Sequence, residues 1–383
     1  MTSRDRFPIG AAVTAEELDR DPHPLLARLR GTEPVSWLPA LGGWLVTRRD
    51  LALTVMRDPA AYTVDDPRFS TAQVIGPSML SLDGPAHTRH RDPFAGPFRP
   101  ARTRERFTAF VEAAVERLVS AMRPRGRAEI RADLAGPLAV GVVAETLGLE
   151  GVDAATVRSW YDAFVRAISD ITAGRPGDAT EAYTRLRAKV EAALDGEPSS
   201  LLVTAARELP LPELVANAAV LMFGGIDTTE GMIANAVMHL AGHPDQLALV
   251  RGDPGLLPGA IEESVRLEPA ASVIDRYACG DVTLGDAHIR KGDLVRVSIA
   301  AANRDPAVFS DPGRYDILRA GADRHLSFAH GPHFCFGAHL ARLETRTALS
   351  ALLRLPDLRL EHPAQPRGLV FRKPAAVHVR WRR

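Results

Sequence analysis

Near its C-terminus the chain reads Phe328-Ala329-His330-Gly331-Pro332-His333-Phe334-Cys335-Phe336-Gly337, and Cys335 is one of only two cysteines in 383 residues. Gly331 and Pro332 predict a turn, and the phenylalanines supply an apolar wall around the thiol. The following pattern is typical of a helix over residues 338–353. Cys335 therefore lies at a helix N-terminus, where free N–H groups favour thiolate over thiol. Thiolate is the form that binds metal, so Cys335 is a candidate metal ligand.

A second informative stretch lies in the longest helical pattern, residues 212–240, and reads Leu221-Met222-Phe223-Gly224-Gly225-Ile226-Asp227-Thr228-Thr229-Glu230. Each mid-helix glycine costs about 1 kcal/mol relative to alanine, so something must compensate. A flat Gly224–Gly225 surface would let a planar cofactor or a diatomic ligand approach the backbone. Thr228 follows Gly224 by four residues and can bond back to its carbonyl. The alternative is a helix-packing contact beside a solvated Asp and Thr.

A third stretch, Ile261-Glu262-Glu263-Ser264-Val265-Arg266, contains Glu-x-x-Arg. This spacing puts Glu263 and Arg266 on one helix face. On its own the pair is a routine surface feature.

Together these motifs resemble the cytochrome P-450 superfamily of haem-thiolate monooxygenases. The first is similar to Phe-Gly-x-Gly-x-His/Arg-x-Cys-x-Gly, the second to the oxygen-binding Ala/Gly-Gly-x-Asp/Glu-Thr, and the third to the family's Glu-x-x-Arg. The resemblance spans roughly residues 21–380, with the motifs in the family's order. It implies a mainly α fold with small β-sheets, in which b-type haem is buried between the long distal helix and the Cys-ligand loop.

The resemblance also implies residue roles. Cys335 would be the axial ligand of the haem iron, Thr228 would position oxygen and protons, and Asp227 would be a relay acid. Adjacent helical residues point about 100° apart, so Asp227 should not line the pocket beside Thr228. The structural set would be Glu263, Arg266 and Arg314. The other cofactor-binding residues would be Gly224, Gly225, Phe328 and Gly337, with His87, Arg91, Arg276 and His333 on the propionates.

One position departs from the family pattern. Ala329 stands where glycine is usual. Because a Cβ penalises the left-handed region, we expect a negative φ at Ala329 and an adjusted loop that keeps its ligand.

Composition is that of an ordinary globular chain, with 46% hydrophobic and 25% charged residues. Basic and acidic residues balance at 47 each, so nothing points to nucleic acid or an anionic membrane. The N-terminus lacks the apolar run of a secretory signal, and the most apolar window, residues 214–226, is too short to span a bilayer. We expect a cytoplasmic, soluble monomer with one domain over residues 1–383, of which residues 1–20 are loosely ordered.

Periodicity predicts a hairpin over residues 35–47 and strands near 273–277, 282–284, 294–299 and 377–381. Helices are predicted over residues 49–56, 103–122, 133–147, 154–168, 178–194, 212–240, 258–267 and 338–353.

The implied reaction is activation of O₂ with two electrons, followed by hydroxylation or another oxidation of a small organic substrate. A secondary-metabolite intermediate is one candidate. No flavin or iron–sulfur domain is fused, so electrons from NAD(P)H would arrive through a ferredoxin and its reductase. We expect them to dock on the cysteine side, at Arg324, His325, His330, Arg342 and Arg346.

Three rival functions share parts of this pattern. A peroxide-driven enzyme would not need the pair formed by Asp227 and Thr228. A non-catalytic haem-thiolate sensor would keep Cys335 without the arrangement at residues 224–228. Oxidative coupling or ring closure on the same fold would retain every motif. By resemblance the substrate pocket draws on residues 62–82, 154–194, 220, 223, 271–274 and 370–371.

Overall fold

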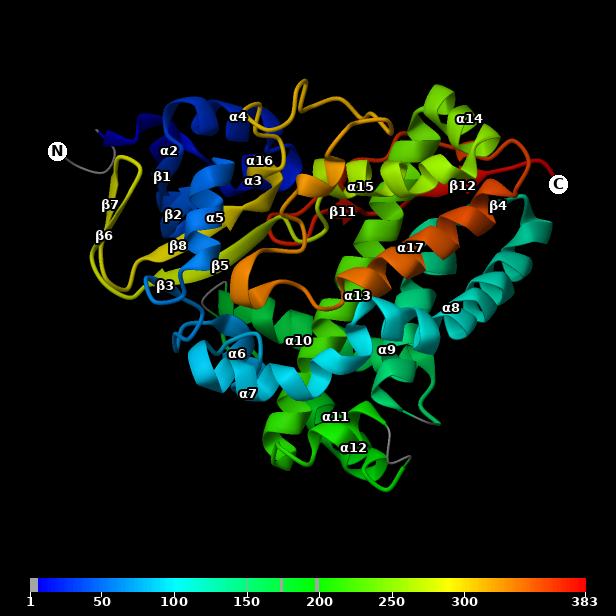
Figure 1. Ribbon diagram of the computed structural model, residues 1–383, viewed down its shortest axis with the longest axis horizontal. Coiled ribbons are helices and arrows are strands. Elements are labelled where there is room, and N and C mark those ends of the chain that lie inside the picture. The colour runs from blue at the N-terminus through cyan, green and yellow to red at the C-terminus, as the bar shows by residue number, and fades with distance from the viewer. Residues whose placement is uncertain (1–5, 150, 173–174, 197–199) are drawn as a thin grey trace.

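A 32-residue helix, α13 (Leu211–Gly242), passes through the middle of the molecule, and the other elements pack around it (Figure 1). The computed structural model describes residues 6–149, 151–172, 175–196 and 200–383. Its outline in Figure 1 is triangular, with a sheet-rich corner near the N-terminus and helices elsewhere. The fold is mainly helical with small sheets, as predicted.

The eight helices predicted by range are present, with ends that differ by at most four residues, and the structure adds shorter helices between them. Helix α13 is buried almost all round because it crosses the interior. Within the described residues, no helix is both long and apolar enough to cross a bilayer. The other helices are α2 (Pro8–Ala12), α3 (Ala15–Arg20), α4 (His23–Thr32), α5 (Arg49–Arg57), α6 (Ser70–Ile75), α7 (Gly84–Ala95), α8 (Pro100–Met122), α9 (Gly136–Leu147), α10 (Ala154–Thr172), α11 (Thr180–Ala193), α12 (Leu201–Ala205), α14 (Pro244–Gly252), α15 (Leu257–Leu267), α16 (Ile299–Ala302) and α17 (Ala338–Leu353).

The main sheet has the strand order β1-β2-β8-β5-β3, and its β1–β2 pair is the predicted hairpin. Strands β2 and β8 are parallel, whereas the other neighbours are antiparallel. The strands are β1 (Val35–Leu38), β2 (Gly43–Val46), β3 (Tyr62–Thr63), β4 (Arg127–Glu129), β5 (Val273–Ala278), β6 (Val282–Leu284), β7 (Ala287–Ile289), β8 (Leu294–Ser298), β9 (Arg359–Leu360), β10 (Pro366–Arg367), β11 (Lys373–Pro374) and β12 (His378–Arg380).

The N-terminal segment differs from expectation. Where the sequence predicted loose order, the described part of residues 1–20 forms α2 and α3. Thr14 and Glu17 make a reciprocal capping box at the start of α3. Val13 and Leu18 are buried against α4 and the sheet, which explains why the segment is folded. That the chain forms one domain remains a prediction.

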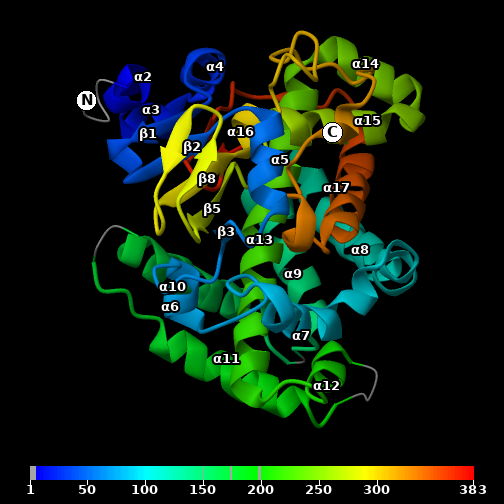
Figure 2. The ribbon, with the colours of Figure 1, turned by 60° about the vertical axis from the view of Figure 1, so that its left-hand side comes forward.

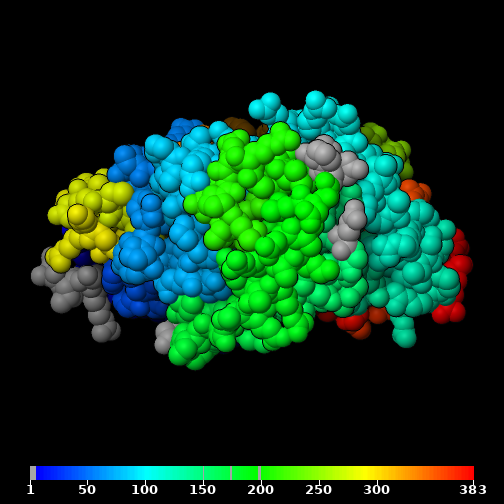
Figure 3. Space-filling model, turned by 90° about the horizontal axis from the view of Figure 1, so that it is seen from below, coloured from blue at the N-terminus to red at the C-terminus, as the bar shows by residue number. Residues whose placement is uncertain are grey.

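The two ends of α13 have different surroundings. Helices α14 and α15 lie near its C-terminal end, while α11 and α12 form the apex at its N-terminal end (Figures 1 and 2). Figure 3 looks onto that apex, where the residues coloured green cover the middle of the face. The middle of α13 packs against α9 and α17, and the candidate site lies at this level.

Candidate functional site

A cavity of about 300 Å³ separates α13 from the stretch before α17. We call that stretch, residues 328–337, the cysteine loop. In Figure 1 it is the orange segment that precedes α17. Eight residues predicted to contact the cofactor or its ligands line the cavity, namely Arg91, Gly224, Gly225, Thr228, Phe328, His333, Cys335 and Gly337.

Cys335 is open to this cavity although protein surrounds it on its other sides. Its backbone N–H donates to the Phe328 carbonyl at 2.9 Å, which closes the loop. Burial raises the pKa of the thiol above its usual value, while the N–H groups of Gly337 and Ala338 and the guanidinium of Arg91 act to lower it. The N–H groups at the helix N-terminus thus lower the pKa of the Cys335 thiol, as predicted, but burial raises this pKa by more.

The loop keeps its shape through two residues with positive φ. Gly331 has a φ of +75°, and a Cβ there would lie 2.4 Å from the Met56 carbonyl oxygen, so only glycine fits against α5. Ala329 has a φ of +59°. The predicted negative φ at Ala329 is therefore wrong. The backbone at Ala329 adopts the left-handed conformation even though the steric clash of a Cβ there costs about 1–2 kcal/mol.

The glycines of α13 have separate roles. A Cβ on Gly224 would meet no atom within 4 Å, because this residue faces the cavity. A Cβ on Gly225 would lie 2.6 Å from Val143 Cγ2 of α9. The Thr228 hydroxyl donates to the Gly224 carbonyl, as predicted. Gly224 thus leaves open space, and Gly225 permits close helix packing.

Asp227 points away from the cavity, as the helical geometry predicted. It does not line the cavity, whereas Thr228 does. Its carboxylate forms an ion pair with Lys373 of β11. Lys373 was not singled out from the sequence, because it lies 146 residues further along the chain.

The four predicted propionate donors gather at one edge of the cavity. Arg91 and His333 line it, and the His87 ring packs against the His333 ring with 4.3 Å between centroids and an angle of 43° between the ring planes. His87 Nε2 is buried and has no hydrogen-bond partner among the described residues, and burial lowers the pKa of His87 to about 4. Arg276 is 5% exposed, and within the described part of the chain its guanidinium makes one hydrogen bond, to the Asp275 carbonyl. These unused donors fit a buried dianionic group.

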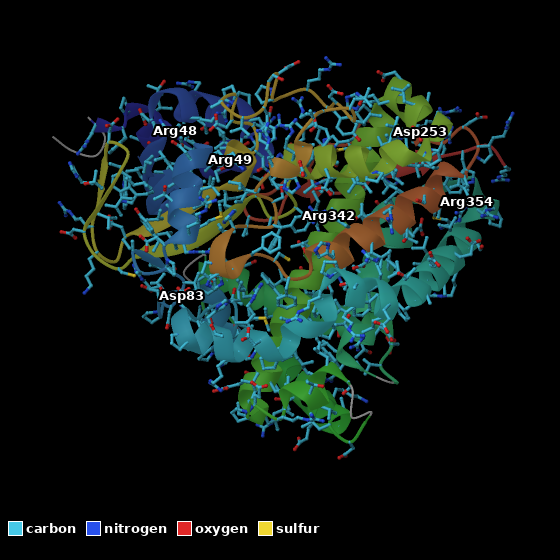
Figure 4. The ribbon with its side chains drawn as sticks, viewed as in Figure 1. Arg48, Arg49, Asp83, Asp253, Arg342 and Arg354 are labelled. Carbon is cyan, nitrogen blue, oxygen red and sulfur yellow. The ribbon has the colours of Figure 1, made fainter. Side chains whose placement is uncertain are left out.

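Asp83 joins this edge and was missed from the sequence. Its carboxylate accepts from His333 Nε2 at 2.8 Å and from the Thr63 hydroxyl at 2.7 Å. Burial raises the pKa of Asp83, but the hydrogen bonds from His333 and Thr63 together lower it by more. The net result is a pKa well below the usual range for aspartate. Asp83 immediately precedes α7, below the cysteine loop in Figure 4. Its position before a helix was the available signal, but an N-cap role would have explained it equally well.

The Glu-x-x-Arg pair is completely buried, and its third member differs from the prediction. Arg266 Nε donates to Glu263 Oε2 at 2.7 Å, and both side chains are 0% exposed. The second guanidinium belongs to Arg319, whose Nε donates to Glu263 Oε1 at 2.8 Å. Arg314 was the wrong candidate, because its side chain is exposed and only its carbonyl accepts from Arg266 and Arg319.

Glu262, one residue earlier, connects α15 to α17. Arg342 Nε donates to it at 2.6 Å, and His325 Nε2 lies 3.0 Å from it. Burial raises its pKa, but the hydrogen bonds from Arg342 and His325 bring the pKa of Glu262 down to about 2. Arg342 is labelled on α17 in Figure 4. The Glu262–Arg342 pair lies after Cys335 along the chain, and the contact between Glu263 and Arg319 lies before it. The chain that presents Cys335 is therefore held to α15 on both sides.

The remaining cavity wall partly matches the predicted pocket. Met79, Leu80, Val220, Ala271 and Ile274 line it. Among the described residues, α10 and α11 contribute no lining side chain, whereas α9 does. The Phe223 and Phe371 rings do not line the cavity and pack edge to face, 5.4 Å apart.

A mainly helical fold in which a glycine-interrupted helix faces a cysteine loop across a cavity defines the haem-thiolate class of proteins. The sequence matches the family Cytochrome P450 over residues 255–373. It is 38% identical to the cytochrome P450 monooxygenase PikC of Streptomyces venezuelae, over 96% of this chain and 93% of that protein. It is 34% identical to the 20-oxo-5-O-mycaminosyltylactone 23-monooxygenase of Streptomyces fradiae, over 87% of this chain and 82% of that protein.

A solved structure agrees with these relatives. The crystal structure of P450BioI in complex with a fatty-acid-ligated acyl carrier protein superimposes with a TM-score of 0.87 at 27% identity, covering 96% of this chain and 100% of that one. The chain belongs to the cytochrome P450 family. It is a cytochrome P450 monooxygenase.

Proposed function

We propose that this monooxygenase holds haem b with Cys335 as the axial ligand and hydroxylates a neutral, largely apolar organic molecule. The observation that carries the proposal is the position of Cys335, which opens onto the cavity opposite Gly224 and Thr228. Cysteine-ligated haem, when bound, supplies reductive activation of O₂.

The protein residues around that group would have distinct tasks. His87, Arg91, Arg276 and His333 would bind the propionates, and their unused donors support this role. Gly224 leaves room for the cofactor and the diatomic substrate. The Thr228 hydroxyl donates its hydrogen to the Gly224 carbonyl, so its oxygen would accept a hydrogen bond from a proton donor at the cavity surface. Asp227 would exchange protons with solvent from outside the cavity.

The substrate class follows from the wall of the cavity. Leu80, Val143, Val220, Ala271 and Ile274 form an apolar surface. The basic lining residues, Arg91 and His333, belong to the proposed propionate set. A neutral apolar substrate loses little hydration here, whereas an anionic group would find no uncommitted cation among the described lining residues. The similarity to the 20-oxo-5-O-mycaminosyltylactone 23-monooxygenase supports a secondary-metabolite intermediate as the substrate.

Electrons would come from a ferredoxin with its reductase, docked on the cysteine side. Arg104, His339, Arg342 and Arg346 line a groove of about 210 Å³ beside the start of α17. His325 does not belong to this docking surface, because it is buried and bonded to Glu262. An acidic partner would associate more slowly as salt is added. A reduction rate that does not change between low and high salt would contradict this docking surface.

The ligand assignment is tested with Cys335→Ser. We expect the haem-containing variant to lose the thiolate-type Soret band that forms when CO is added to the reduced protein. Cys279→Ser is the matched control, because Cys279 is an exposed cysteine outside the cavity and should leave that band unchanged. Retention of the band in Cys335→Ser would overturn the assignment.

The substrate class is tested by titrating the holoenzyme with neutral macrolactones and with carboxylate analogues of the same size. We expect Soret shifts with the neutral compounds only. A Val220→Asp variant should lose these shifts, because it places a charge on the apolar wall, while its CO band remains. Shifts caused by the carboxylates alone would overturn the substrate class without affecting the role of Cys335.

A further inference from the structure

A tight turn between α6 and α7 supplies part of the cavity wall. We call residues 78–81 the wall turn. The Ser81 N–H donates to the Ser78 carbonyl at 3.0 Å, which places Met79 and Leu80 at the tip of a β-turn. The Ser81 hydroxyl also accepts from the Ser78 N–H at 3.1 Å. Both tip residues line the cavity, so the position of this turn decides the shape of the wall.

The wall turn is attached to α13 through one side chain. Asn217 is 0% exposed, and its Oδ1 accepts from the Met79 N–H at 2.8 Å. The bonds within the turn do not use this N–H, so Asn217 satisfies a buried donor. Val220 and Gly224, which line the cavity, follow Asn217 by three and seven residues and so lie on the same side of the helix. Asn217 therefore holds the turn against the side of α13 that borders the cavity.

The side-chain amide of Asn217 is held in one orientation. Its Nδ2 donates to the Glu213 carbonyl at 2.8 Å and lies 3.0 Å from His90 Nδ1. A flipped amide would set its N–H groups against the Met79 N–H and its oxygen against the Glu213 carbonyl oxygen. The orientation with Oδ1 on Met79 is thus the one that satisfies every partner.

His90 of α7 supports this arrangement and is 1% exposed. Because Asn217 directs an N–H at Nδ1, the neutral ring carries its hydrogen on Nε2, which lies 3.3 Å from the Glu213 carboxylate. Glu213 in turn pairs with Arg89 at 2.7 Å. The wall turn, α7 and the start of α13 are therefore joined by one network of polar side chains around Asn217.

The wall turn differs from the other walls of the cavity in how its backbone is held. Val220, Val143 and Ile274 belong to α13, α9 and β5, whose main chains are fixed by helical or sheet hydrogen bonds. The wall turn belongs to no helix or strand. Among the described residues, the bond from Met79 to Asn217 is the one hydrogen bond that joins its backbone to another element. A side chain, and not a backbone ladder, thus decides where this wall lies.

We propose that Asn217 is a positioning residue that sets the shape selectivity of the enzyme. It keeps Met79 and Leu80 close to α13, so the cavity retains its width and disfavours bulky ligands. Without the bond from Met79, the wall turn could move away from α13 and the cavity would widen. This inference rests on the proposed function, because it takes the cavity to be the site of a neutral apolar substrate.

The test uses imidazole and clotrimazole as probes. Both bind haem iron through an imidazole nitrogen, but only clotrimazole also fills the cavity with aryl groups. Their dissociation constants for the holoenzyme are measured from the Soret shift. Asn217→Leu conserves the volume of the side chain but cannot accept from Met79, so we expect clotrimazole to bind about tenfold more tightly relative to imidazole. Asn217→Asp still offers an oxygen to the Met79 N–H and should keep the ratio of the unaltered enzyme.

Gln246→Met is the matched control. Gln246 of α14 also ties a loop to a helix, because its Oε1 accepts from the Ile317 N–H at 2.9 Å and its Nε2 donates to the Tyr315 carbonyl at 2.8 Å. It does not line the cavity, so its loss should leave the ratio unchanged. A merely structural role of Asn217 predicts that Asn217→Leu behaves like Gln246→Met. An unchanged ratio in Asn217→Leu, or a ratio shifted against clotrimazole, would overturn the proposal.

Hydrogen exchange tests the attachment of the wall turn without haem. In a peptide spanning residues 76–83, the Met79 amide should exchange at least about tenfold faster in Asn217→Leu than in the unaltered chain or in Asn217→Asp. An unchanged rate would also overturn the proposal. Asn217→Ser makes the same predictions should Asn217→Leu fail to fold, because the shorter serine bonds to the Glu213 carbonyl and does not reach Met79. If the unaltered protein with haem lacked the thiolate-type CO band, the proposed function would fail, whereas the exchange rates would still decide whether Asn217 holds the turn.

Discussion

At the scale of single residues, Ala329 has a backbone conformation that alanine disfavours, because the shape of the cysteine loop requires it. Its φ of +59° would suit glycine, yet alanine occupies the position. We expect Ala329→Gly to raise the free energy of unfolding by about 0.5–1 kcal/mol. Relief of the left-handed strain, about 1–2 kcal/mol, exceeds the extra chain entropy that glycine loses on folding. Urea unfolding followed by circular dichroism measures this difference.

The matched control for Ala329→Gly is Ala307→Gly. Ala307 is exposed in a turn and has no positive φ. Glycine should therefore lower the free energy of unfolding there, by about 0.5–1 kcal/mol, through entropy alone. Destabilisation of the same size at both positions would show that Ala329 is not strained.

Arg319 and Arg314 offer a second test at this scale. Arg319 is 7% exposed and completes the hydrogen bonding of the fully buried Glu263. Arg319→Met should lower the free energy of unfolding by about 3 kcal/mol, because a buried carboxylate loses one of its two cations. Arg314→Met should change it by less than about 0.5 kcal/mol, since that side chain is exposed. Urea unfolding distinguishes the two, and equal losses would restore Arg314 to the cluster.

At the scale of elements, α13 depends on two adjacent glycines for different reasons. Gly224→Ala should raise the free energy of unfolding of the haem-free protein by about 1 kcal/mol, because alanine favours helix and the new Cβ meets no protein atom within 4 Å. Gly225→Ala should lower it by about 1–2 kcal/mol, because its Cβ would lie 2.6 Å from Val143 Cγ2. Urea unfolding of both variants measures the contrast.

A double variant shows whether the Gly225 effect is steric. Val143→Ala makes space on α9, so Gly225→Ala should be less harmful in that background than in the unaltered chain. Additive effects of the two substitutions would mean that the loss of stability in Gly225→Ala does not come from a clash with Val143. Haem content per chain, measured alongside, should fall for Gly224→Ala, whose methyl group enters the cavity.

Sequence could predict those parts of the site that are set by spacing within one element. Thr228 bonds to the carbonyl four residues earlier, and Glu263 pairs with the arginine three residues later. It could not choose between Arg314 and Arg319, because both lie in the same irregular segment and only the folded path decides which reaches Glu263. Lys373 left no local signal at all, since β11 meets α13 only in the folded chain.

At the scale of the whole molecule, one buried carboxylate connects distant parts of the chain. Glu268, at the end of α15, is 5% exposed and pairs with His23 of α4, Arg304 and Arg372. Burial raises its pKa, but the hydrogen bond from His23 and the charges of Arg372 and Arg304 bring the pKa of Glu268 down to about 2. The N-terminal helices and the C-terminal strands are thereby attached to the centre of the fold.

This cluster predicts part of the acid sensitivity of the fold. The folded pKa of Glu268 is below its usual value of 4.5, so its stabilisation is fully present above pH 4.5 and is lost as the pH falls toward about 2. Glu268→Gln should lower the free energy of unfolding at pH 7 by about 3–5 kcal/mol, because Arg304 and Arg372 lose a buried partner. The difference from the unaltered protein should shrink steadily below pH 4.5. Urea unfolding at pH 7, 5 and 3.5 tests both statements.

Glu16→Gln is the control, because Glu16 is 77% exposed. It should change the free energy of unfolding by less than about 0.5 kcal/mol at each pH. A loss for Glu268→Gln that stays constant down to pH 3.5 would mean that the cluster is not held together by the charge of Glu268.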